Sequence, residues 1–177
     1  MRINTRLIIK CAIYALIFIF LIVLETNIFN DLRIFGAKPN FVISLVIAAS
    51  VLENERYGAA LGFVSGFIMD SAFDSPFLFS GLYYFFAAYI AGLCARLYFA
   101  KSLWTMLILS VPVLAVRSIF NLFFLAGTWY EFEILAVLSE LILPEYLYSL
   151  ATAPIVYFLV KFTAAKISYS NMSNMYI

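Results

Sequence analysis

Long apolar stretches separated by short polar connections divide the sequence into six segments of helical length. A transmembrane helix needs about 20 mostly apolar residues, because each residue rises 1.5 Å and the hydrocarbon core is about 30 Å thick. The pattern predicts one polytopic membrane domain over residues 1–177, an all-α bundle of six transmembrane helices. The predicted spans are about 8–24, 40–54, 56–70, 77–97, 103–125 and 146–163, and a half-helix is expected at about 132–143, ended by Pro144.

The second and third spans have uncharged cores, 41–52 and 57–69, that are too short to cross the membrane alone. A re-entrant hairpin would explain their length. It would also place Glu53, Glu55 and Arg56 at a tip in the middle of the bilayer, where charges are costly. We therefore expect two spans, each extended by the polar residues that flank it.

Glycine recurs every fourth residue in the third span, at Gly58, Gly62 and Gly66, and the next step of four reaches Asp70. Steps of four advance only about 40° around a helix, so neighbouring members of this series share a face. Small residues on such a face let two helices approach closely in lipid. The stripe predicts a tight helix crossing, either generic membrane packing or a partner-binding face that ends in a carboxylate.

Composition supports a membrane protein, since 66% of the residues are hydrophobic, 12% are charged and the mean hydropathy is +1.03. The net charge of +1 argues against nucleic acid as a partner. The chain has no histidine, and its two cysteines, Cys11 and Cys94, lie far apart. Neither a metal site nor a cofactor is therefore expected, and catalysis finds little support.

The basic residues predict the orientation, because lysine and arginine gather on the cytoplasmic side of membrane proteins. With both termini in the cytoplasm, Arg33 and Lys38 fall outside and Arg117 falls within the fifth span. All other basic residues then fall inside: Arg2, Arg6, Lys10, Arg56, Arg96, Lys101, Lys161 and Lys166.

Arg117 is the most informative single residue, because a charge inside an apolar span is expensive unless it is paired. Its predicted depth in the outer half of the membrane suggests an ion pair with Asp70 or Glu140. Asn121 lies one turn further on, so Arg117, Asn121 and Glu140 form a predicted intramembrane polar cluster. Such a cluster would bind a ligand or partner helix, or would simply brace the bundle.

Several motifs resemble those of the rod shape-determining membrane protein MreD family. They are Gly36-Ala37-Lys38-Pro39-Asn40-Phe41 before the second span, Gly58 to Asp70, Phe79-Ser80-Gly81-Leu82-Tyr83-Tyr84 opening the fourth span, Gly92 within it and Pro154 in the sixth. The likeness covers nearly the whole chain. It adds Pro39, Gly81 and Gly92 to the candidates for helix packing or partner binding.

The resemblance implies a non-enzymatic scaffold or regulatory subunit of the cell-elongation machinery in a bacterial cytoplasmic (inner) membrane. The implied partners are membrane lipid, a bitopic scaffold like MreC and, through it, the MreB filament and the peptidoglycan synthases. A homo-oligomer is also possible. The family is similar in fold to the substrate-binding subunits of energy-coupling-factor transporters.

Two other functions are alternatives to a scaffold or regulatory subunit. A vitamin-capture subunit of an energy-coupling-factor transporter would need an outer pocket, which Trp129, Tyr130 and Glu140 could line. A lipid-modifying enzyme is disfavoured by the absence of histidine and of a clustered nucleophile.

Overall fold

A computed structural model describes residues 5–25, 39–72, 80–128 and 142–173, and these residues contain helices and no strand. The helices are α1 (Thr5–Val23), α3 (Phe41–Leu52), α4 (Glu55–Ala72), α5 (Ser80–Tyr98), α6 (Leu103–Thr128) and α8 (Leu143–Ser173). The predicted all-α class is confirmed for this part of the chain. Almost all of the half-helix expected at 132–143 lies outside the described residues.

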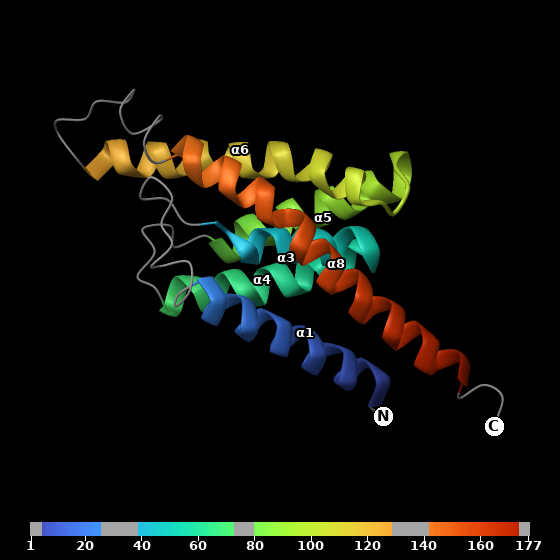
Figure 1. The fold of residues 1–177 in the computed structure, drawn as a ribbon. Helices are drawn as coiled ribbons and strands as arrows, with labels where there is room; N and C mark the ends of the chain where they lie inside the picture. The colour runs from blue at the N-terminus through green and yellow to red at the C-terminus, as the bar shows by residue number, and fades with distance from the viewer. Residues whose placement is uncertain (1–4, 26–38, 73–79, 129–141, 174–177) are drawn as a thin grey trace.

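Helix α3 lies in the middle of the bundle and contacts each of the other five helices. Figure 1 shows α1 and α4 on one side of it, α6 on the other and α8 crossing in front. Every residue from Phe41 to Val51 is buried. A helix that is apolar on all sides suits either lipid or the centre of a bundle, and here neighbouring helices cover it. Its 12 residues rise only about 18 Å, which is less than the thickness of the hydrocarbon core. A helix that other helices cover on all sides does not have to match that thickness.

The start of α3 is held by hydrogen bonds from two directions. Asn40 is the N-cap, and its Oδ1 accepts a hydrogen bond from the Ile43 amide at 2.9 Å. The Asn40 amide donates to Ser149 Oγ on α8 at 2.8 Å. Pro39 lies buried just before this cap. The cap therefore also joins α3 to α8.

The other end of α3 is tied to α1 and to the α5–α6 connection. The buried Tyr14 hydroxyl donates to Glu53 Oε1 at 3.2 Å, and the Tyr14 ring meets Tyr57 edge-on at 5.2 Å. Lys101 Nζ donates to the carbonyl oxygens of Leu52 at 2.8 Å and Glu53 at 3.3 Å. A cation at the carbonyl end of a helix is favourable, because the helix dipole is negative there.

The two ends of the chain lie at the same end of the bundle (Figure 1). The α3–α4 tip and the α5–α6 connection are found there too, so Arg56, Arg96 and Lys101 gather at one end. This arrangement is the one that the predicted orientation requires, with these cations and both termini in the cytoplasm.

Helix α8 is longer at both ends than the span predicted at 146–163. It begins at Leu143, so Pro144 lies in its first turn. Proline suits a first turn because the amide it lacks would have no intrahelical acceptor there. Pro112 in α6 and Pro154 in α8 lie inside helices.

The outer surface of the bundle is apolar. Large hydrophobic side chains are exposed on α1, α4, α5, α6 and α8, for example Leu16 (67%), Phe67 (64%) and Phe123 (75%). Soluble monomers rarely expose continuous apolar surface on this scale, so a lipid environment is indicated. By length and composition, α6 and α8 each contain a stretch able to cross a membrane, Leu103–Phe120 and Leu143–Ala165.

Replacing Asn40 by alanine should destabilise the bundle by about 1–2 kcal/mol, because the Ile43 amide loses its acceptor in a buried place. Asn54→Ala is the matched control, since Asn54 is exposed and its Oδ1 accepts only a 3.3 Å bond from the Arg56 amide. Thermal unfolding in detergent measures the difference. Equal midpoints for the two variants would contradict the role of the Asn40 cap.

Candidate functional site

The glycine stripe of α4 lies against α3 and α5 of the same chain. A Cβ added to Gly58 would lie 2.5 Å from Ser50 Cα, and one on Gly62 would lie 2.7 Å from the Tyr84 carbonyl oxygen. A Cβ on Gly66 would lie 2.6 Å from Gly81 Cα. These contacts are with backbone, which cannot move aside as a flexible side chain can. The stripe therefore forms a close crossing between helices of this chain.

Gly81 and Gly92 supply the α5 half of this crossing. Gly81 faces the backbone of Phe63 and Phe67, and Gly92 faces Ser50 Oγ and Glu55 Cα. Ser50 Oγ in turn donates to the Ala88 carbonyl, so α3 and α5 are also joined by a hydrogen bond. The candidate glycines and Pro39 are thus buried within this chain, and their role in binding a partner stays a prediction.

Asp70 lies near the end of α4 and holds the start of α5. Its Oδ2 accepts a hydrogen bond from the Ser80 amide at 2.9 Å. Its Oδ1 is buried and has no hydrogen-bond partner among the described residues. The carboxylate at the end of the glycine stripe therefore acts first as a connection between the two closely packed helices.

Arg117 lies about 20 Å along α6 and is paired differently from the prediction. Its Nη1 donates to the Tyr84 hydroxyl at 2.9 Å, and its guanidinium carbon lies 5.9 Å from the centre of that ring. Its Nη2 lies 3.9 Å from Glu145 Oε1. The described residues show no ion pair between Arg117 and Asp70, and the alternative pair with Glu140 stays a prediction, because Glu140 lies outside them.

The remaining members of the predicted polar cluster cannot be placed beside Arg117. Glu140 lies outside the described residues, and so does the side chain of Asn121. Trp129 and Tyr130, proposed with Glu140 to line a vitamin pocket, are also outside them.

Tyr84 and Glu145 were not predicted as partners of Arg117, although both lie near helix starts at the end of the bundle that Arg117 approaches. Tyr84 belongs to the tyrosine pair that opens the fourth predicted span. No spacing in the sequence links these residues, because they meet only through the packing of α5, α6 and α8.

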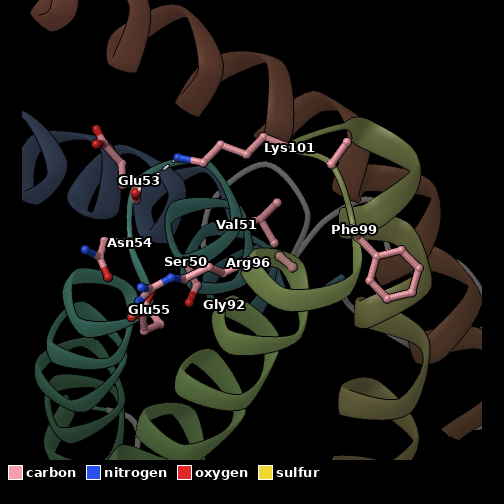
Figure 2. A pocket seen from close by; sticks show the side chains of 11 residues that line it. Ser50, Val51, Glu53, Asn54, Glu55, Gly92, Arg96, Phe99 and Lys101 are labelled. Atoms are coloured by element: carbon pink, nitrogen blue, oxygen red, sulfur yellow. Dashed lines mark hydrogen bonds and ion pairs between the residues drawn. The ribbon is translucent and has the colours of Figure 1, made fainter.

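A pocket of about 540 Å³ opens where the α3–α4 tip meets the end of α5 and the start of α6. Figure 2 shows the Arg96 and Glu55 side chains facing each other across the α4–α5 crossing, with Lys101 reaching over the end of α3. Arg96 Nη1 and Glu55 Oε1 are 2.7 Å apart. The backbone amide of Glu55, and then Arg96, hold the pKa of the Glu55 carboxyl below its ordinary value.

Two apolar grooves open on the lipid-facing surface. The α1–α4 groove, of about 330 Å³, includes Cys11, Ala15, Ala60 and Val64. The α5–α6 groove, of about 380 Å³, is lined in part by Ala91, Cys94, Pro112 and Val116. Each groove therefore contains one of the two cysteines of the chain.

The described residues contain no group of histidine, cysteine, aspartate or glutamate side chains that could hold a metal ion. The described residues instead show helix packing: a covered central helix, a glycine crossing and partly buried polar contacts between helices. Together with the apolar outer surface, this arrangement defines a helical membrane protein.

The sequence matches the family described as rod shape-determining protein MreD over residues 5–166. Because this match covers nearly the whole chain, the protein belongs to the MreD family, a membrane protein family of rod shape determination. No curated protein sequence and no solved structure matches the chain. The suggested likeness to energy-coupling-factor subunits therefore stays a prediction.

Replacing Gly66 by alanine should lower the free energy of unfolding by about 1–3 kcal/mol. Alanine is the better helix former by up to about 1 kcal/mol, but its methyl group would collide with the Gly81 backbone. Ala60→Val is the matched control, because it enlarges an exposed side chain on the same helix. A Gly66→Ala variant as stable as wild type in detergent would refute the close crossing.

Replacing Arg117 by methionine should cost about 1.5–3 kcal/mol, because Tyr84 and Glu145 lose a charged partner in a partly buried site. Glu145→Gln in the same chain should then have a smaller effect than it has alone. A double-mutant cycle on unfolding midpoints measures this coupling. Strictly additive effects would show that Arg117 and Glu145 do not interact.

Proposed function

We propose that the protein is a multi-pass, non-enzymatic subunit of the elongation complex in the bacterial inner membrane, with both termini in the cytoplasm. It scaffolds or regulates peptidoglycan synthesis by binding the transmembrane helix of a bitopic MreC-like protein. Contact with the MreB-like filament and the peptidoglycan synthases is then indirect. The observation that carries this proposal is the family match over residues 5–166.

The α1–α4 groove is the surface that best suits such a helix. Its walls include Ala15, Ala60 and Ser65, and small side chains allow a foreign helix to approach closely. Helices α1 and α4 both pack on α3 and touch each other where the Tyr14 ring meets Tyr57. A partner helix could lie along the groove beside this contact. Exposed Val64 and Ile68 offer it apolar area.

Disulfide cross-linking with the natural thiols tests this proposal. Cys11 lies in the α1–α4 groove and Cys94 in the α5–α6 groove, so each serves as the control for the other. Single cysteines are introduced along the transmembrane segment of the bitopic partner, and membranes are oxidised. We expect cross-links to Cys11, at partner positions one helical turn apart, and none in the Cys11→Ser variant.

One outcome would contradict the groove assignment, and others would contradict the proposed function. Cross-links formed only with Cys94 would move the partner to the α5–α6 groove. Failure to recover any bitopic scaffold or cell-wall synthase when the protein is purified in mild detergent would contradict the elongation-complex function itself. Recovery of ATPases together with a second polytopic subunit would instead favour the transporter alternative.

A further inference from the structure

The pocket at the α3–α4 tip presents positive charge outward and keeps its acids inside. The Arg96 side chain is 69% exposed, whereas that of its partner Glu55 is only 8% exposed. Lys101 is exposed, and Glu53 is half-buried and bonded to Tyr14. A group that approaches from outside the bundle therefore meets the two cations first.

Both cations keep hydrogen-bonding capacity after their internal contacts are made. A guanidinium has five N–H donors, and among the described residues Arg96 uses one nitrogen, Nη1, on Glu55. An ammonium has three donors, and Lys101 uses two of them on the carbonyls at the end of α3. Gly92 and Ala95 also line the pocket. The pocket can thus accept a compact anion with several oxygen acceptors.

The neighbouring aromatic residues place this pocket at the membrane surface. Tyr98 at the end of α5 is 77% exposed, and Trp104 at the start of α6 is 74% exposed. Tyrosine and tryptophan concentrate at the level of the lipid headgroups, where one part of the ring is in lipid and its polar atom is hydrated. A phosphate group is abundant at this depth as part of phospholipids.

We propose that the pocket formed by Arg96 and Lys101 binds the phosphate of an anionic phospholipid headgroup in the cytoplasmic leaflet. The phosphate oxygens accept hydrogen bonds from the remaining N–H groups of Arg96 and Lys101, and the acyl chains lie along the exposed apolar side chains beside the pocket. Basic pockets between helix ends on the cytoplasmic side are suited to such headgroups. The bound lipid would join α5 and α6 to the α3–α4 tip.

Native mass spectrometry of the delipidated, purified protein tests this site. The probes are phosphatidylglycerol and, as the zwitterionic comparison, phosphatidylcholine of the same chain length. We expect one phosphatidylglycerol to be retained in preference to phosphatidylcholine, and Arg96→Gln to weaken its binding about tenfold. Lys161→Gln is the matched control, because it removes an exposed cation of α8 that does not line the pocket.

Equal weakening by Arg96→Gln and Lys161→Gln would overturn the proposal, because binding would then follow net charge alone. If Arg96→Gln does not fold, the wild-type protein still decides: its preference for phosphatidylglycerol should shrink as salt is raised, and an absent preference refutes the site. Retention of inorganic phosphate as strong as that of phosphatidylglycerol would refute a lipid ligand in favour of a soluble anion.

Discussion

The structure depends on complete coverage of one short helix. Helix α3 is apolar on every side, and its residues from Phe41 to Val51 are buried. The other five helices all pack on it, and α4 and α5 do so while also packing closely on each other. The glycines of α4 and α5 permit this, because side chains at Gly62 or Gly66 would push the two backbones apart. The glycine crossing thus lets both helices cover α3.

Polar side chains complete the same design at the two ends of the bundle. At one end, Asn40 joins the start of α3 to α8, and Asp70 holds the start of α5. At the other, Lys101 holds the end of α3, and Glu55 pairs with Arg96 across the α4–α5 crossing. These groups make their bonds within the chain, which leaves the lipid-facing surface apolar. Partner helices and lipids are therefore expected to bind in grooves and at the exposed cations, rather than at the glycine stripe.

Much of this fold could be predicted from the sequence, and the failures have a common physical cause. The all-α class could be predicted because apolar runs and polar breaks are local features, and the glycine stripe was recognised because a spacing of four defines one helix face. Tyr84 and Glu145 were missed as partners of Arg117 because they lie on other helices, and no spacing encodes that proximity. The central place of α3 had a usable signal, its lack of any polar face, which the short length of the helix obscured.

Accessibility of α3 in the bilayer tests the central claim most directly. Ser44 and Ala48 can each be replaced by cysteine in a chain whose natural cysteines are removed, with exposed Leu16 of α1 as the comparison. Spin labels or small thiol probes at these positions, read with one lipid-soluble and one water-soluble quencher, report what reaches each residue. The account predicts that neither quencher reaches α3 while the lipid-soluble one reaches position 16. Quenching of both α3 positions from the lipid phase would contradict a central, fully covered helix.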